Sequence, residues 1–168
     1  MKAIGAIGIG VATTLISTVI INAVYHAEVK KRAFNYAKSL AGEKGIINLG
    51  AGPHRTLLAQ TIAASPEVVA NLDIVPNGVP NFIQWDIEEG LPFADKAFDV
   101  AFASHVLEHL DNWEFALSEV TRVADHAVVV LPHPLSLTGW LNPAHKQHFS
   151  REDMANMERA FPNVKVLC

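Results

Sequence analysis

The sequence predicts an α/β fold with a mostly parallel sheet, helices on both sheet faces, and one transmembrane helix before it. From residue 45 onward, short apolar runs alternate with segments of helical periodicity. Continuous apolar strands that alternate with helices are typical of a parallel sheet covered on both faces. Before that point, residues 3–27 contain no Asp, Glu, Lys or Arg. This uncharged stretch is the basis for the transmembrane helix.

The apolar segment at residues 3–24 has the length of a membrane-spanning helix. About 22 residues at ~1.5 Å each give ~33 Å, which is enough to cross a bilayer core. A cleaved signal peptide is the alternative, but its apolar core is usually about 7–15 residues long. Only Lys2 precedes the segment, whereas three basic residues follow it at 30–32. The positive-inside rule therefore predicts a single-pass membrane protein whose domain lies on the cytoplasmic side.

Small residues recur along one side of this segment. Ala6, Gly10 and Thr13 lie three or four residues apart, so they share one face of a helix. Small side chains let helices approach closely in lipid. They predict a helix partner in a membrane complex, although small residues are also common in membrane helices in general.

The chain divides into the anchor and two further parts. Residues 1–27 are the predicted anchor, residues 28–44 a linking amphipathic helix, and residues 45–168 the α/β domain. The predicted strands of the domain are residues 45–50, 68–75, 81–87, 98–104, 126–132 and 164–168. The predicted helices between them are residues 55–65, 114–124 and 150–161. Ser150 and Asp153 form a capping-box pattern at the start of the last helix.

Composition narrows the class of function. The net charge is −4 and the basic residues are scattered, so no nucleic-acid partner is expected. The single cysteine, Cys168, excludes an internal disulfide and fits a reducing compartment.

Glycine and polar residues stand where the predicted strands end. They are Gly50 and Gly52 after the first strand, Asp73 after the second, Asp86 after the third, and Ser104 with His105 after the fourth. Ligands of parallel sheets bind outside the carboxyl ends of the strands, and a carboxylate about 20 residues after a glycine turn can hold ribose hydroxyls. Each residue taken singly also fits a turn or a helix cap. Their occurrence together at successive strand ends favours a ligand site.

The chain resembles the class I S-adenosylmethionine-dependent methyltransferases, and most closely the type 11 group. The resemblance rests on NLGAGPH, NLDIV and QWDIEEGLPFADKAFDVAFASHVLEHL, within residues 46–132. It implies a Rossmann-like fold, S-adenosylmethionine as cofactor, and in-line methyl transfer helped by alignment and exclusion of water. A nicotinamide-dinucleotide site is set aside, because Arg55 stands where that fingerprint needs its third glycine.

The resemblance also assigns roles to individual residues. The implied cofactor-binding set is Asn48, Gly50, Gly52, Asp73, Asp86, Ile87 and Ser104. In this assignment the two glycines leave room for the methionine part of the cofactor, and Asp73 binds its ribose. Asp86 and the Ile87 amide bind the edge of its adenine. Ser104 and His105 lie beside the sulfonium. Asn48 replaces the family's acidic residue, the usual PGG turn is missing, and the domain is short at its C-terminal end, without the family's seventh strand. These departures put cofactor affinity and activity in question, but not the fold.

Histidines supply the catalytic candidates. His105 and His145 are the candidate catalytic residues, since an imidazole near an acceptor can take its proton. Loop histidines that only stabilise the fold are the alternative. The HVLEH order of residues 105–109 differs from the HExxH of zinc proteases, so no metal site is predicted.

Two functions follow from this sequence. The first is a membrane-anchored methyltransferase that moves a methyl group from S-adenosylmethionine to a small or lipid-associated acceptor. The alternative is a catalytically silent subunit of a membrane complex with the same fold. Trp140 and Leu141, after the fifth strand, are expected either to line an acceptor pocket or to enter the bilayer interface.

Overall fold

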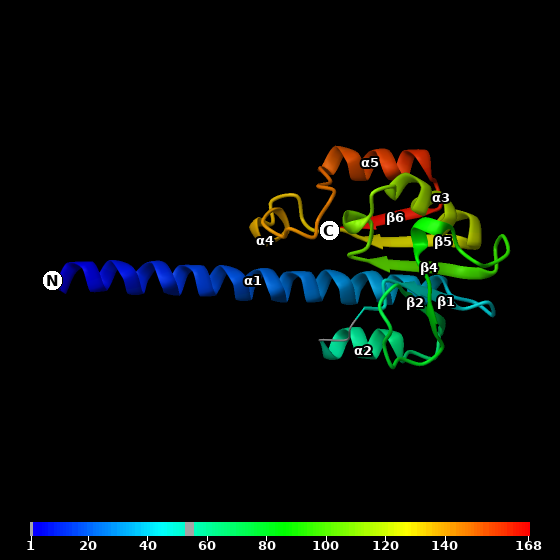
Figure 1. The fold of residues 1–168 in the computed structure, drawn as a ribbon, viewed down its shortest axis with the longest axis horizontal. Coiled ribbons are helices and arrows are strands. Elements are labelled where there is room, and N and C mark those ends of the chain that lie inside the picture. Colours follow the sequence, from blue (N-terminus) through cyan, green and yellow to red (C-terminus); the bar gives the residue numbers. More distant parts are fainter. Residues whose placement is uncertain (1, 53–55) are drawn as a thin grey trace.

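A six-stranded, fully parallel sheet forms the centre of the computed structural model (Figure 1). The structure describes residues 2–52 and 56–168, with the side chains of residues 2–20, 137 and 138 left aside. The strands are β1 Ile46–Leu49, β2 Val68–Asp73, β3 Phe82–Gln84, β4 Phe98–Ser104, β5 Ala124–Val130 and β6 Val164–Leu167. Their order in the sheet is β3-β2-β1-β4-β5-β6. The predicted α/β, Rossmann-like sheet is confirmed.

The helices are α1 Lys2–Leu40, α2 Leu57–Ala63, α3 Trp113–Val123, α4 Leu137–Trp140 and α5 Arg151–Ala160, with single 3₁₀ turns η1 Ile87–Glu89 and η2 Leu107–His109. Helices α2, α3 and α5 lie between the strands as the sequence pattern predicted, whereas α1 precedes the first strand and the short α4 was not predicted. At the start of α5, Ser150 and Asp153 each accept a hydrogen bond from the other's backbone N–H. The predicted capping box is therefore present.

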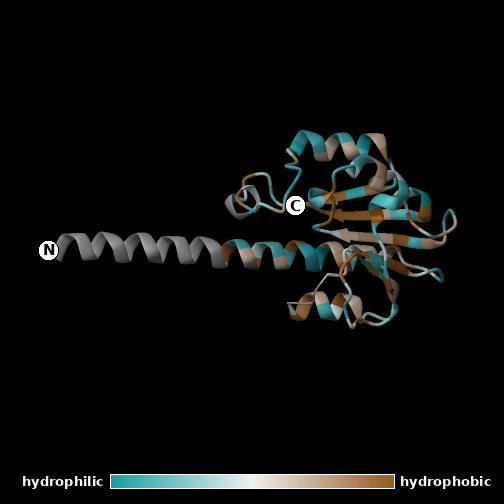
Figure 2. Cartoon of the chain, in the orientation of Figure 1, coloured by the Kyte–Doolittle hydropathy of each residue, from teal (hydrophilic) through white to brown (hydrophobic). Residues whose placement is uncertain are grey.

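Alternate strand residues face opposite sides of the sheet, and each side has its own helices. Ile46, Val100, Phe102, Val128 and Val130 pack against α1 and α2. Ile47, Ala101, Ala103, Ala127 and Val129 pack against α3 and α5. Because both faces of the sheet are covered by helices, successive strand residues are buried on opposite faces and the strands are apolar throughout. Figure 2 shows β5 coloured hydrophobic, while much of α5 is hydrophilic.

Helix α1 continues without a break across residues 27 and 28, where the sequence analysis placed a boundary between two parts. It is one continuous helix, and its last turns belong to the core of the domain. Val29, Ala33, Phe34 and Ala37 are buried against the sheet, with the ring of Phe34 5.3 Å from that of Phe102. The helix predicted within residues 28–44 is thus present as the last turns of α1, and those turns pack into the core of the α/β domain.

Within the residues whose side chains the structure describes, no helix has the length and apolar character needed to cross a membrane. The predicted anchor at residues 3–24 lies mostly outside them. So does the predicted small-residue face of Ala6, Gly10 and Thr13.

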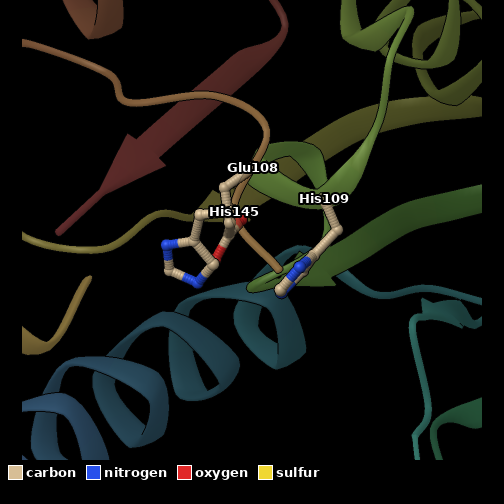
Figure 3. Close-up of side chains that lie close together, drawn as sticks. All are labelled: Glu108, His109 and His145. Atoms are coloured by element: carbon tan, nitrogen blue, oxygen red, sulfur yellow. The ribbon is translucent and has the colours of Figure 1, made fainter. Parts of the chain in front are cut away.

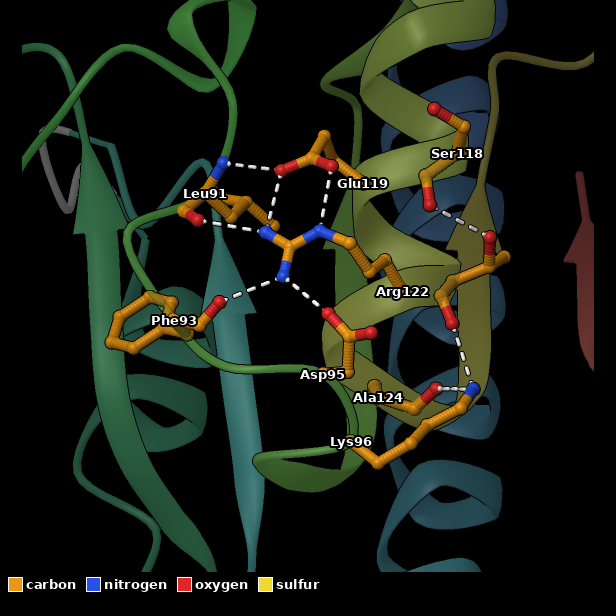
Figure 4. Close-up of polar contacts among 9 residues, drawn as sticks. Leu91, Phe93, Asp95, Lys96, Ser118, Glu119, Arg122 and Ala124 are labelled. Carbon is orange, nitrogen blue, oxygen red and sulfur yellow. Dashed lines mark hydrogen bonds and ion pairs between the residues drawn. The ribbon is translucent and has the colours of Figure 1, made fainter.

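Arg122 connects α3 to the loop that precedes β4 (Figure 4). Its guanidinium donates to both carboxylate oxygens of Glu119, at 2.7 Å each, and to the carbonyl oxygens of Leu91 and Phe93. Glu119 also accepts from the Leu91 amide at 2.8 Å. Hydrogen bonds from Arg122 first, and from the Leu91 amide, lower the pKa of Glu119. The network fixes the loop that brings the chain back into the sheet.

We expect Glu119→Gln to destabilise the full chain at pH 7 by about 1.5–3 kcal/mol, because charge-assisted hydrogen bonds are lost from a side chain that is 15% exposed. A carboxyl with a lowered folded pKa stabilises above its unfolded pKa of 4.5, and that stability is lost as the pH falls through the folded pKa. The difference between the two proteins should therefore shrink below pH 4.5. Urea unfolding in detergent at several pH values measures it.

Ser118→Ala is the matched control, since Ser118 lies on the same helix and its hydroxyl donates only to the Phe115 carbonyl oxygen. It should leave stability nearly unchanged at every pH. A Glu119→Gln effect that does not depend on pH would contradict the role given to the carboxylate.

Candidate functional site

A cavity of about 450 Å³ opens at the carboxyl ends of the strands, and we call it the edge cavity. The chain crosses from one side of β1 to the other between β3 and β4, so the neighbours β1 and β4 form the switch point where ligands of such sheets bind. Six of the predicted site residues line the edge cavity: Gly50, Gly52, Asp73, Asp86, Ile87 and His105. The parallel sheet therefore brings together residues that are distant in the sequence.

The glycines of the first turn are explained by backbone conformation. Gly50 and Gly52 have φ values of +66° and +58°, which favour glycine. At Gly50 a Cβ would also collide with Cγ2 of Val106. At Gly52 the only heavy atom of the described residues near an added Cβ is the Gly50 carbonyl oxygen, at 3.7 Å.

Asp73 supports this turn from the end of β2. Its Oδ2 accepts from the amide of Gly52 at 2.6 Å, and its Oδ1 accepts from the amide of Val75 at 2.8 Å. Each carboxylate oxygen keeps a further lone pair, so the side chain can still accept from two hydroxyls. Asp73 is both a structural support of the glycine turn and a candidate ligand-binding group.

Asp86 begins the 3₁₀ turn η1 at the end of β3. Its Oδ1 accepts from the amide of Glu88 at 2.9 Å and caps the turn. Ile87 follows, with its side chain buried in the wall of the edge cavity. Asp86 can therefore cap the turn and also line the edge cavity, so the two roles considered from the sequence do not exclude each other.

Two of the predicted cofactor-binding residues do not line the edge cavity. The buried Asn48 donates from Nδ2 to Oδ1 of Asn71 at 2.8 Å, so its amide links β1 to β2. Asn71 in turn donates to the carbonyl oxygens of Ala63 and Pro80. Ser104 is buried, and its hydroxyl has no hydrogen-bond partner among the described residues. The ligand contacts predicted for these two side chains therefore stay predictions.

His105 has the backbone strain that is often found at functional sites. It adopts a φ of +58°, and its amide donates to the Val130 carbonyl oxygen at 2.9 Å. Its Nδ1 lies 3.0 Å from Oε1 of Glu108. A carboxylate only accepts, so Nδ1 carries the proton and Nε2 is left for another partner.

His145 lies beside a second cavity, of about 260 Å³, which we call the loop cavity. The segment between β5 and α5 forms most of its wall, including His133, Trp140 and His148. Burial lowers the pKa of His145, so its imidazole is neutral at pH 7 and can accept a proton. His105 and His145 therefore line different cavities.

Helix α1 runs antiparallel to the strands and reaches the site with its described N-terminal turns. The ring of His26 is 5.4 Å from that of His105, and the hydroxyl of Tyr25 donates to the Cys168 carbonyl oxygen at 2.9 Å. At the opposite edge of the sheet, Lys38 pairs with Glu67 at 2.9 Å. Burial, and then the neighbouring His105, lower the pKa of His26. Sequence analysis did not place this helix at the site.

Other residues of the edge cavity were also missed. Trp85 and Val106 each adjoin a predicted residue, and that adjacency was the only signal in the sequence. Trp85 is held by a hydrogen bond of 2.6 Å from its indole N–H to the Gly90 carbonyl oxygen. Lys146 comes from the segment before α5, about 40 residues after His105. No sequence spacing places that segment over the cavity.

Comparison with solved structures identifies relatives of this fold. A S-adenosylmethionine-dependent methyltransferase from Archaeoglobus fulgidus matches with a TM-score of 0.60 at 24% identity, over 81% of this chain and 68% of that one. A possible histamine N-methyltransferase from Thermotoga maritima matches with a TM-score of 0.56 at 18% identity, over 82% and 72%.

A putative methyltransferase in complex with the Trm112 methyltransferase activator, from Haloferax volcanii, gives a TM-score of 0.54 at 18% identity, over 82% of this chain and 66% of that one. At these identities the likeness shows the fold. No curated protein matches.

The family is shown by the sequence itself. The family model Methyltransf_11, described as a methyltransferase domain, matches residues 5–130, which is three quarters of the chain. Its match includes every residue that lines the edge cavity except Lys146. The chain therefore belongs to the methyltransferase-domain family.

Proposed function

We propose that this methyltransferase works at a membrane surface, to which residues 3–24 attach it, and that it methylates a lipid-associated acceptor. One observation carries the proposal. Exposed apolar side chains gather at the edge of the sheet where the site opens, and the apolar N-terminal segment joins the domain at that same edge.

Five exposed residues define this surface, which we call the apolar rim: Ile21, Val24, Leu135, Trp140 and Leu141. Leu135 and Leu141 are 86% and 72% exposed, and Trp140 is 60% exposed. Single exposed apolar residues are common on proteins, but a group of them at one edge marks an interaction surface. An aromatic and several aliphatic side chains suit a bilayer interface.

The direction of α1 relates the apolar rim to the segment at 3–24. Asn22 donates to the hydroxyl of Ser136 at 3.1 Å, and Tyr25 contacts the C-terminal carbonyl, so these turns lie beside the carboxyl ends of β5 and β6. The chain that precedes Ile21 therefore enters the domain at the site edge. If that segment is inserted in a bilayer, both cavities face the membrane surface.

The opposite edge of the sheet has a different chemistry. Lys44 pairs with Asp125 there, and Lys38 pairs with Glu67. Charged, hydrated side chains at this edge suit water rather than lipid. The contrast between the two edges supports one orientation of the domain, with its amino-end edge away from the membrane and, as the charge pattern predicts, in the cytoplasm.

The chain's own residues have defined tasks in the proposed reaction. S-Adenosylmethionine, when bound, supplies a methyl group carried on a sulfonium. Asp73 would hold the ribose hydroxyls, and Asp86 with the Ile87 amide would hold the adenine edge. His145, neutral at pH 7, would accept a proton from the acceptor, while the segment between β5 and α5 excludes water. His105 is positioned by Glu108 at the wall of the edge cavity.

We expect Asp73→Ala to weaken S-adenosylmethionine binding by about tenfold to a hundredfold, because a charge-assisted pair of hydrogen bonds is lost. The variant should also be less stable than the wild type, since Asp73 accepts from the amides of Gly52 and Val75. Asp73→Asn keeps an acceptor and separates the two effects. Calorimetry on the full chain in detergent measures binding, and thermal melting measures stability.

Glu114→Gln is the control for Asp73, because Glu114 is an exposed carboxylate in the first turn of α3. It should leave the affinity unchanged. Wild-type affinity in both Asp73 variants would remove Asp73 from the cofactor site. Cofactor binding without methyl transfer to any acceptor would instead favour the silent subunit.

The orientation can be tested with spin labels. Cys168→Ser removes the native thiol, and Leu141→Cys or Val69→Cys then places a nitroxide on the apolar rim or on β2 near Gly45 at the charged edge. In lipid vesicles the label at position 141 should be more accessible to oxygen than to a water-soluble nickel chelate. The label at position 69 should show the reverse. Equal accessibility at both positions would contradict a membrane-facing site.

A further inference from the structure

We propose that Glu108, His109 and His145 form a binding site for a divalent transition-metal ion, at the junction of the two cavities. Figure 3 shows the three side chains gathered together, with Glu108 and His109 on the turn η2 and His145 in the segment before α5. One ligand atom from each lies within 4.8 Å of the other two. Sequence analysis predicted no metal from the HVLEH order of residues 105–109, and it gave no reason to place His145, 36 residues after His109, beside them.

Glu108 is the strongest indication of a ligand. Its side chain is fully buried, and only Oε1 has a partner, His105 Nδ1 at 3.0 Å. Oε2 is buried without a hydrogen-bond partner among the described residues. A buried carboxylate oxygen left unpaired is costly, so buried carboxylates are normally paired or coordinate metals. A cation beside Oε2 would remove that cost.

His109 has the hydrogen bond that prepares an imidazole for metal binding. Its Nδ1 lies 2.9 Å from the carbonyl oxygen of Ala144. A carbonyl only accepts, so Nδ1 carries the proton and Nε2 keeps its lone pair. Metal-binding histidines commonly donate their other N–H in this way, which fixes the ring and its tautomer.

Hydrogen bonds to the backbone of Glu108 keep His145 close to the other two ligands. The Glu108 carbonyl oxygen accepts from the amides of Lys146 and Gln147, at 2.8 and 3.0 Å. These bonds fix the residues directly after His145 against η2. The ring centroids of His109 and His145 are 4.8 Å apart and nearly perpendicular. The segment before α5 is thus fastened to the turn that carries the other ligands.

The position of the three ligands indicates what the ion would do. His109 lines the edge cavity and His145 lines the loop cavity, so the ion would lie between the cofactor and the acceptor. One carboxylate and two imidazoles suit Zn²⁺ and related ions and leave coordination positions open. This role rests on the proposed function and changes the task of His145 there: with its lone pair on the ion, His145 would not take the proton. The ion would instead bind a hydroxyl oxygen of the acceptor, whose proton would leave more readily to solvent water at the cavity mouth. The acceptor class is therefore a hydroxyl compound.

The test is a metal titration of the full chain, prepared without a histidine tag, in detergent and after removal of metals by a chelator. Co²⁺ should bind in a 1:1 ratio with visible ligand-field absorption, and Zn²⁺ should displace it. His145→Ala should weaken Co²⁺ binding by about a hundredfold, at or above the loss caused by altering an outer-shell partner. His109→Ala should do the same.

His148→Ala is the matched control, since His148 lies in the same segment but stacks on Trp140, at 4.5 Å between centroids. It should bind Co²⁺ as the wild type does. The proposal is overturned if neither ion binds, if His145→Ala and His109→Ala keep wild-type affinity, or if His148→Ala loses as much. The titration contains no cofactor and no acceptor, so its failure would leave the methyltransferase proposal standing.

Discussion

The packing of α1 across the sheet is the constraint on which the arrangement of the molecule depends. Ala33, Phe34 and Ala37 are buried against strands β4 and β5, with the ring of Phe34 against Phe102. Because side chains of this size interlock, the helix is held in one direction, antiparallel to the strands. That direction carries His26 to His105 and the preceding chain to the site edge. One apolar contact thus sets both the approach of α1 to His105 and the place where residues 3–24 join the domain.

The parallel sheet explains which site residues could be predicted from sequence. Gly50, Asp73 and Asp86 end three strands that share one edge, so a correct strand assignment was enough to bring them together. The assignment succeeded because strands buried on both faces are apolar without interruption, and turns with glycine or aspartate interrupt the pattern. The fold and the centre of the site therefore follow from local patterns.

Side-chain direction and long-range contact explain the rest. The side chain of Asn48 donates its hydrogen bond to Asn71. No sequence motif predicts this pairing, because the partner of a buried amide depends on how two strands pack. The meeting of His145 with Glu108 depends on how the segment between β5 and α5 folds back over the sheet. Such a segment is fixed by a few hydrogen bonds to η2 rather than by periodicity, so its course could not be predicted.

That segment also relates the membrane proposal to the chemistry. It carries Leu135 and Leu141 of the apolar rim, and a few residues later it carries His145. Its only described helix is the short α4, and hydrogen bonds from Lys146 and Gln147 to Glu108 anchor it next to the site. Lipid contact at one end of the segment would therefore bear directly on the position of His145 at the other. Under the proposed function, an acceptor held in the bilayer would meet the loop cavity without leaving its lipid, which would account for the exposed apolar side chains of the rim.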